Sequence, residues 1–449
     1  MKQSYDVVVV GGGAAGLGAA LASARNGAST LLIERYGFLG GSLTAGLIAH
    51  YDPILQLEIT GIAREIYEKM KERGSAKEFD MSGVEMPFCF WQGGCGLDAE
   101  DYKALALSLL EEAGAELLLH AWAGGVLMEG NQVTGVTVYH KSGKTDITAK
   151  TVIDATGDGD VAALAGVPFE LGDEEGCMSS SLCVNIGGVD MEALYRYLEE
   201  NPEELGNHPR LGKYIRDARK SSIIQGFYRL IRQAKAAGDL SIDLPEQGIG
   251  MTALPLEGSF HVNAIRLPGV NTIDPEDLTR LEVNQHQELQ ELFRFMKKYL
   301  PGFENAFILQ SGVQTGVRES RRIFGDYRLT IGDIKEGVRF PDSIARTKWG
   351  HTDNHSGKTM QWTFEFIEGP YYIPYRILLA QGKENLLVAG RCASAAKKAM
   401  ASIRIMPLCT MMGQAAGTAA ALAAKESVTP RKIPVEKLQK ALRAQGVSL

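Results

Sequence analysis

Residues 5–41 read YDVVVVGGGAAGLGAALASARNGASTLLIERYGFLGG, and this stretch decides the fold. The β-branched run at 7–10 predicts a strand buried on both faces of a parallel sheet. The small-residue segment 14–26 predicts a helix that ends before Gly27, and 29–34 predicts a second strand. A strand, a helix and a second parallel strand in this order predict a Rossmann-like βαβ unit in an α/β fold.

The turn between the first strand and the helix carries a dinucleotide-binding pattern. Gly11, Gly13 and Gly16 match GxGxxG directly after the predicted strand. The first glycine permits a tight turn, the second lets the backbone approach a pyrophosphate, and the third lets helix and strand pack closely. The N–H groups at the start of the helix, at Ala14 and Ala15, would face the phosphates.

Glu34 ends the second predicted strand, 18 residues after Gly16. Its carboxylate could accept hydrogen bonds from ribose hydroxyls, whereas it would repel a 2′-phosphate. A glycine turn without a ligand would not explain an acid at this place. These residues therefore predict a dinucleotide site and leave both NAD and FAD open.

The segment that follows Glu34 favours FAD. Arg35, Gly40 and Gly41 form an RxxxxGG arrangement, and Ser42 comes next. Together with GxGxxG, this arrangement resembles the glutathione-reductase-like superfamily of flavoproteins, in which it extends the FAD site toward the flavin. The resemblance implies FAD as the cofactor and these residues as part of its site.

Two later segments resemble other FAD-contacting parts of that superfamily. They are TVIDATGDGD at 151–160 and NLLVAGRCASA at 385–395, the second followed by a helix. A helix that starts at Pro407 can aim its free N–H groups at the flavin edge where negative charge collects on reduction. The resemblance implies that FAD also contacts Ala155, Thr156, Gly157, Asp160, Gly390, Arg391, Pro407, Leu408 and Cys409.

TGVRESRRIFGDYRLT at 315–330 narrows the resemblance to the FAD-dependent oxidoreductase family within that superfamily. The resemblance covers nearly the whole chain and is strongest over residues 1–180 and 310–425. The chemistry of this family is poorly defined. The resemblance therefore implies a fold and a cofactor rather than one reaction.

The chain is predicted to form two domains. Residues 1–180 and 325–449 would form a discontinuous, Rossmann-like FAD-binding domain, because both ends of the chain show strand, glycine turn and helix patterns. Polar helices such as the one predicted at 275–300 mark residues 181–324 as an inserted α+β substrate domain. We expect the active site between the two domains, at the flavin.

Within the first domain, the sequence predicts helices at 62–73 and 98–113. Short strands separated by GNQ and KSGK turns predict an antiparallel meander at 124–150. A separate buried strand is predicted to begin at Thr151.

The RESRR motif supplies two candidates for the active site, Arg318 and Arg322. These arginines could bind a carboxylate, sugar hydroxyls or the flavin ring. Structural ion pairs with Glu319 or Asp326 are an equally good account.

His355 is the candidate general base, and the resemblance favours it because a DxH pattern recurs near here in the family. Asp353 would project to the same side of an extended strand and could orient the imidazole. A histidine that only satisfies loop contacts is the alternative. Tyr375 is a weaker candidate, and His50 and Tyr51 could approach the flavin face.

The composition of the chain limits the classes of partner and ligand that we expect. The chain has 449 residues, with 54 acidic and 47 basic residues and a formal net charge of -7, and no basic tract, so a nucleic-acid partner is not expected. The cysteines show no zinc or iron-sulfur spacing, so we expect no metal. Residues 407–424 would make a poor membrane span, and no signal peptide pattern precedes the first strand. We therefore expect a cytoplasmic protein of undetermined oligomeric state.

No second GxGxxG with its own strand and ribose acid is present in the sequence, so electrons would be exchanged with an external acceptor or donor. We expect hydride transfer between flavin N5 and a small polar substrate, namely an alcohol, sugar, amine or hydroxy acid. Two alternatives stay open. One is a reductase of an activated double bond fed by a separate electron donor, and the other is an RNA-modifying flavoprotein.

Overall fold

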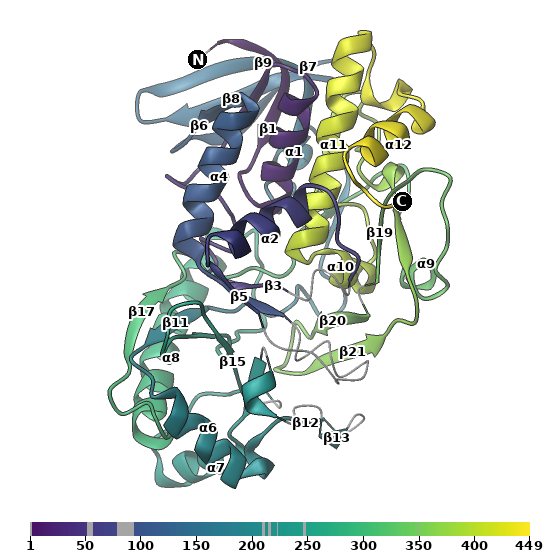
Figure 1. Ribbon diagram of the computed structural model, residues 1–449. Coiled ribbons are helices and arrows are strands. Elements are labelled where there is room, and N and C mark those ends of the chain that lie inside the picture. The colour runs from purple at the N-terminus through teal and green to yellow at the C-terminus, as the bar shows by residue number, and fades with distance from the viewer. Residues whose placement is uncertain are drawn as a thin grey trace.

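The computed structural model describes residues 2–51, 57–78, 94–208, 212–213, 217–221, 223–245, 248–348 and 350–449. Two sheets organise these residues. A seven-stranded sheet takes six of its strands from residues 4–154 and its seventh from residues 386–388, and a five-stranded sheet is built from the middle of the chain (Figure 1).

The seven-stranded sheet has the strand order β6-β2-β1-β9-β8-β7, and β23 also pairs with β9. β1 pairs in parallel with β2 and β9, and β23 is parallel to β9. The side chains of Val7 to Val10 are buried, as predicted for a strand covered on both faces. The strands are β1 (Ser4–Val10), β2 (Thr30–Ile33), β6 (Glu116–Leu118), β7 (Trp122–Glu129), β8 (Gln132–His140), β9 (Gly143–Asp154) and β23 (Leu386–Val388).

β9 differs from the sequence prediction in its length. The sequence suggested that the meander ends near residue 150 and that a separate strand begins at Thr151. Instead, one continuous strand of 12 residues pairs antiparallel with β8 and parallel with β1. The edge of the meander is therefore continuous with the centre of the parallel sheet, which fixes the position of the turn that follows Asp154.

Helix α1 (Ala14–Arg25) packs closely against α11 (Met406–Glu426) beside this sheet (Figure 1). A Cβ at Gly413 would lie 1.9 Å from the carbonyl oxygen of Ala15, and one at Gly417 would lie 2.1 Å from that of Ala19. These glycines therefore allow the backbones of the two helices to touch. The face of α11 that meets α1 is therefore small enough for this close packing.

The five-stranded sheet has the order β14-β15-β16-β11-β17 and lies with α6, α7 and α8 in the lower part of Figure 1. All of its strands fall within residues 181–324, although the domain boundaries themselves remain a prediction. Its elements are β11 (Val184–Gly187), α6 (Met191–Glu200), β14 (Ile223–Gly226), α7 (Tyr228–Ala237), β15 (Ile249–Ala253), β16 (Phe260–Val262), α8 (Pro275–Tyr299) and β17 (Phe307–Ser311).

The remaining elements connect or cover these two parts. The predicted helices at 62–73 and 98–113 are present as α2 (Ile62–Glu72) and α4 (Ala99–Ala113). The shorter elements are β3 (His50–Tyr51), β4 (Ala76–Glu78), β5 (Cys95–Leu97), α5 (Asp160–Leu164), β10 (Phe169–Leu171), β12 (Asn207–His208), β13 (Gly212–Lys213), β18 (Arg321–Ile323), α9 (Ile331–Lys335), β19 (Ser343–Thr347), β20 (His351–His355), β21 (Trp362–Phe366), β22 (Tyr371–Pro374), α10 (Lys397–Ile403) and α12 (Val435–Ala444).

In the part of the chain that the structure describes, no single helix has both the length and the apolar composition to cross a membrane. α10 and α11 reach that composition only as a pair, and a bend of 91° separates them.

Candidate functional site

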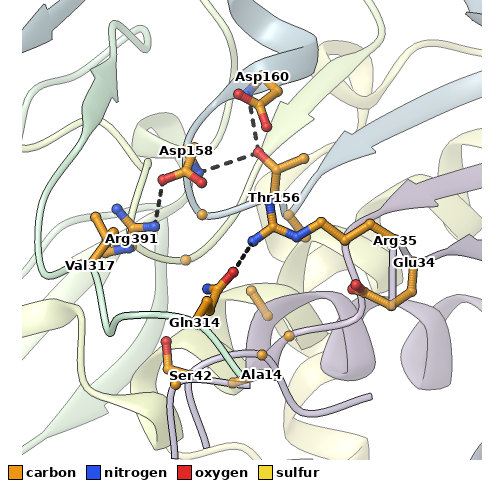
Figure 2. Close-up of a pocket in the computed structure, with 18 of the residues that line it drawn as sticks. Ala14, Glu34, Arg35, Ser42, Thr156, Asp158, Asp160, Gln314, Val317 and Arg391 are labelled. Carbon is orange, nitrogen blue, oxygen red and sulfur yellow. Dashed lines mark hydrogen bonds and ion pairs between the residues drawn. The ribbon is translucent and has the colours of Figure 1, made fainter. Parts of the chain in front are cut away.

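A cavity of about 260 Å³ lies at the carboxyl ends of β1, β2 and β9 (Figure 2). This is the position at which open α/β sheets bind their ligands. Fifteen of the nineteen residues predicted to bind FAD line the cavity: Gly11, Gly13, Ala14, Ala15, Glu34, Arg35, Gly41, Ser42, Ala155, Thr156, Gly157, Asp160, Gly390, Arg391 and Cys409. Segments far apart in the sequence are thus brought to one place.

The glycine turn forms the wall of the cavity beside β1. Gly11 has φ +99°, and a Cβ there would lie 2.6 Å from the carbonyl oxygen of Ala155. Gly13 is the N-cap of α1 and provides no side-chain cap, so the first-turn N–H groups of the helix remain available beside the cavity. Such N–H groups suit a phosphate.

Two of the predicted glycines shape the cavity without being among the described residues that line it. A Cβ at Gly16 would lie 1.7 Å from the carbonyl oxygen of Gly11, so Gly16 permits the strand and helix to pack. Gly40 has φ +115°, and a Cβ there would lie 2.5 Å from Thr44. Gly40 therefore permits the turn that presents Gly41 and Ser42 to the cavity.

Glu34 is buried and lines the cavity at the end of β2. Its Oε2 accepts a hydrogen bond from the N–H of Gly12 over 2.6 Å, and its Oε1 accepts one from the N–H of Tyr36 over 2.9 Å. Two backbone donors therefore fix the orientation of the carboxylate. A carboxylate held in this way is suited to accept hydrogen bonds from ribose hydroxyls.

The turn after β9 is organised around Asp154 and Thr156. The fully buried carboxylate of Asp154 accepts hydrogen bonds from the N–H of Ala162 and the hydroxyl of Thr156. Burial raises the pKa of Asp154 to about 6 in spite of these donors. The Thr156 hydroxyl in turn accepts from the N–H groups of Asp158 and Asp160 (Figure 2).

An ion pair between Asp158 and Arg391 lies in the cavity lining. Nη2 of Arg391 is 2.6 Å from Oδ1 of Asp158 (Figure 2). The Ser320 hydroxyl contacts both residues. Burial by itself would raise the pKa of Asp158, but the charge of Arg391 and these hydrogen bonds hold it below the usual value. The pair therefore stays ionised and places a guanidinium beside the cavity. Asp158 was missed although it stands between the predicted residues Gly157 and Asp160.

The start of α11 lines the cavity through Met406 and Cys409, with Arg404 just before it. Residues three apart lie on one face of a helix, so Met406 and Cys409 face the same way. Pro407 and Leu408, which were predicted to contact the cofactor, are buried and are not among the described lining residues. Helical periodicity could have predicted Met406 in their place.

A second wall of the cavity comes from the part of the chain that carries the five-stranded sheet. Thr272, Leu278 and Glu282 contribute to it, together with the segment 314–317. Three residues of that segment begin the quoted motif TGVRESRR, but the sequence analysis singled out its arginines instead. On the opposite wall, which the seven-stranded sheet provides, Trp122 at the start of β7 also lines the cavity.

None of the five catalytic candidates is among the described residues that line the cavity. Arg318 is the nearest in sequence, directly after Val317, and its Nη1 donates to the carbonyl oxygen of Ser179 and the hydroxyl of Ser181. Tyr375 is buried, and its hydroxyl donates to the carbonyl oxygen of Pro430. These contacts are structural, and catalytic roles for the candidates stay predictions.

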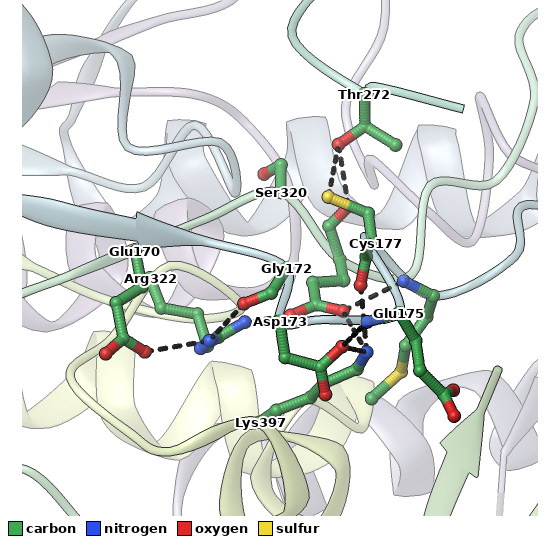
Figure 3. Close-up of polar contacts among 12 residues, drawn as sticks. Glu170, Gly172, Asp173, Glu175, Cys177, Thr272, Ser320, Arg322 and Lys397 are labelled. Carbon is green, nitrogen blue, oxygen red and sulfur yellow. Dashed lines mark hydrogen bonds and ion pairs between the residues drawn. The ribbon is translucent and has the colours of Figure 1, made fainter. Parts of the chain in front are cut away.

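Arg322 forms the structural ion pair that the sequence analysis weighed as an alternative. Its Nη1 donates to the buried carboxylate of Glu319, and its Nη2 contacts Glu170 and the carbonyl oxygen of Gly172 (Figure 3). Lys397 lies on the other side of Glu319, with 3.8 Å between Nζ and Oε2. The group holds three segments together.

His355 is buried at the end of β20, and its ring stacks on Trp362 with centroids 5.8 Å apart. The prediction for the Asp353 side chain falls outside the described residues, because only its backbone in β20 is described. His50 forms part of β3 and is half-buried, and Tyr51 is fully buried. Among the described residues, no group of three or more His, Cys, Asp or Glu side chains could hold a metal ion.

Comparison with known proteins agrees with this architecture. The sequence pattern of the family described as FAD dependent oxidoreductase matches residues 6–442. A geranylgeranyl bacteriochlorophyll reductase-like protein from Thermoplasma acidophilum has a similar fold, with a TM-score of 0.54 over 99% of this chain and 84% of that chain at 16% identity. An identity this low supports the shared fold alone.

Among curated proteins, the chain is 28% identical over 227 residues to digeranylgeranylglycerophospholipid reductase 1 from Methanococcoides burtonii. It is 30% identical over 166 residues to digeranylgeranylglycerophospholipid reductase from Thermoplasma acidophilum. The matches cover 48% and 34% of this chain, and 51% and 40% of the two relatives. The chain therefore matches about half, or less, of the length of these relatives.

Proposed function

Because the chain belongs to the FAD-dependent oxidoreductase family, we propose that it is a reductase of carbon–carbon double bonds whose electrons come from a separate donor. The protein is an FAD-dependent enzyme. The observation that carries the finer proposal is the similarity to proteins named as reductases of digeranylgeranyl lipids. This similarity favours the reductase of a double bond, which the sequence left open as an alternative, over the oxidation of a small polar substrate.

We infer that FAD occupies the cavity. The open N–H groups after Gly13 and the guanidinium of Arg391 supply positive charge for a pyrophosphate, and Glu34 supplies a carboxylate for ribose hydroxyls. The residues present thus fit the chemistry of a dinucleotide. Bound there, FAD would supply the hydride-transfer chemistry that reduction of a double bond needs.

The described lining of the cavity also bears on the reaction. Its side chains include acids and arginines but, among the described residues, no histidine and no lysine. Oxidation of an alcohol or an amine needs a base beside the reacting C–H group. Its acids, Glu34, Asp158, Asp160 and Glu282, already accept hydrogen bonds from protein donors. In either direction the proton is therefore exchanged with a group outside the acids and arginines of this described lining, and the choice of a reductase rests on the similarity to the reductases.

The proposal is tested by two anaerobic experiments on the FAD-loaded protein. In the first, enzyme that has been reduced with dithionite and freed of excess reductant is mixed with an isoprenoid alcohol or an unsaturated carbonyl compound. Return of the visible flavin absorbance, together with the saturated product, is expected. In the second, oxidised enzyme is mixed with alcohols, sugars, amines and hydroxy acids, and no bleaching is expected. Bleaching by one of these compounds, with no reoxidation by any alkene, would restore the polar-substrate hypothesis.

A further inference from the structure

A hydrogen-bonded bridge joins the two walls of the cavity. Nη2 of Arg35 donates to Oε1 of Gln314 over 2.6 Å (Figure 2). The hydroxyl of Tyr36 donates to the same oxygen. Arg35 and Tyr36 follow β2 of the seven-stranded sheet, whereas Gln314 follows β17 of the five-stranded sheet. We call these three residues the bridge.

The Arg35 end of the bridge is held by aromatic rings. Its guanidinium lies 4.9 Å from the ring centroid of Tyr36 and 5.4 Å from that of Trp122. Tyr36 in turn stacks on Phe38, with centroids 5.3 Å apart. Cation–π contacts of this kind hold a guanidinium in one orientation. The donors of the bridge are therefore pre-positioned.

The Gln314 end is held by its backbone and by its neighbour. The N–H of Gln314 donates to the carbonyl oxygen of Ala45 over 3.2 Å. The N–H of Thr315 donates to Glu282, and the Thr315 hydroxyl donates to the fully buried Gln285 on α8. None of these contacts uses the side chain of Gln314. Removing that side chain should therefore delete the bridge and leave the segment in place.

We propose that the bridge is a latch on the FAD site, and that it must open each time FAD enters or leaves. All three of its residues are half-buried, which places the bridge where the cavity meets solvent. Each crossing of the cofactor then breaks two hydrogen bonds, one of them donated by a charged group. The latch slows the exchange of FAD in both directions. This inference rests on the placement of FAD in the cavity and is independent of the substrate that is reduced.

The test is the exchange rate of FAD in Gln314→Ala. Bound radiolabelled FAD is exchanged against excess unlabelled FAD, and association is followed by tryptophan fluorescence after apoprotein is mixed with FAD. Both rate constants should rise at least about tenfold, because the charge-assisted hydrogen bond from Arg35 and the one from Tyr36 are both lost, and the dissociation constant should change little. Tyr36→Phe should give a smaller acceleration and no additional one in the Gln314→Ala background, because the two residues share one contact.

Gln310→Ala is the matched control. Gln310 is also half-buried, lies four residues before Gln314, and donates to Glu100 over 3.3 Å outside the cavity lining. Its exchange rates should equal those of the unmodified protein. Unchanged exchange in Gln314→Ala would overturn the latch. Faster dissociation with unchanged association would also overturn it, because Gln314 would then be a direct contact of FAD.

Two further results keep the test decisive. If Gln314→Ala lowers the melting temperature of the apoprotein, Tyr36→Phe carries the test, since it removes a single hydroxyl. The premise has its own check in Gly13→Ala: unchanged FAD affinity in that variant would mean that FAD lies elsewhere, whatever happens at Gln314.

Discussion

Arg391 and Arg322 each form an ion pair with a carboxylate, but they do so in different surroundings. Arg391 pairs with Asp158, and both line the cavity. Arg322 pairs with the buried Glu319, and neither of these is among the described lining residues. Both arginines stand in motifs that the sequence analysis singled out. An arginine in a motif of this kind therefore indicates an ion pair. Only an arginine that follows the carboxyl end of a parallel strand, as Arg391 follows β23, also indicates a ligand site.

Replacing each arginine by methionine should affect two different quantities. The free energy of unfolding should fall at Arg322, and the affinity for FAD should fall at Arg391. Arg322→Met leaves Glu319 buried with only the more distant Lys397 among its described cationic partners, at 3.8 Å. Removing one member of a buried pair costs about 3–5 kcal/mol. We expect urea denaturation to show a loss of this size, with little change in FAD affinity of the folded protein. A loss of less than about 1 kcal/mol would show that Glu319 is satisfied without the arginine.

Asp154 is a fully buried carboxylate, and hydrogen bonds rather than an arginine hold it. Its pKa is raised from 3.8 to about 6, so the folded state binds the proton more tightly than the unfolded chain does. Its contribution to the free energy of unfolding is therefore fully present below about pH 4 and is lost as the pH rises through about 6, by about 3 kcal/mol in total.

This pH dependence is measured as the difference between the unmodified protein and Asp154→Asn, which cannot titrate. As the pH is raised from about 5 to 7, the free energy of unfolding of the unmodified protein should fall relative to that of Asp154→Asn. A difference that stays flat over this range would show that the carboxylate is ionised throughout.

Arg391→Met tests the cavity side of the comparison. The substitution removes a positive charge from the lining and leaves the ionised Asp158 there. We expect the dissociation constant of FAD to rise tenfold to a hundredfold, corresponding to about 1.5–3 kcal/mol for a hydrogen bond to a charged group. Titration of the apoprotein with FAD measures this. An effect no larger than that of Arg322→Met would remove the distinction between the two pairs.

Gly13→Ala is expected to have the smallest effect. A Cβ there would lie 3.7 Å from Cα of Gly41, an ordinary contact, so the apoprotein should melt at the same temperature. Its methyl group would nevertheless stand where the backbone approaches the pyrophosphate, and FAD should bind several-fold more weakly, by about 1 kcal/mol. The contrast is Gly16→Ala, in which a Cβ 1.7 Å from the Gly11 oxygen should destabilise the apoprotein itself.

The residues on the seven-stranded sheet were predictable because the requirement is local. A tight turn, a helix start and an acid at the end of a strand leave a pattern within 40 residues, and Gly11, Gly13 and Glu34 line the cavity as that pattern suggests. At α11 the segment was correctly chosen but the residues were not, because Pro407 and Leu408 follow one another in sequence while one helix face presents Met406 and Cys409.

The second wall could not be predicted in the same way. Gln314 reaches Arg35 across 279 positions of sequence, and nothing local to either residue indicates the contact. The double role of β9 was also hidden, since its residues alternate in its exposed half and are uniformly buried in its last four residues, which mimics two separate strands. The first contact is determined by the packing of the two sheets, and the second by strand pairing within one sheet.

The most direct test of the account is a crystal structure of the protein grown with FAD. The account predicts continuous density for FAD along the cavity, in contact with the glycine turn at Gly13 and with Arg391, and with the bridge closed over it. Density for FAD outside this cavity, or a cavity filled by the side chains that now line it, would contradict the account.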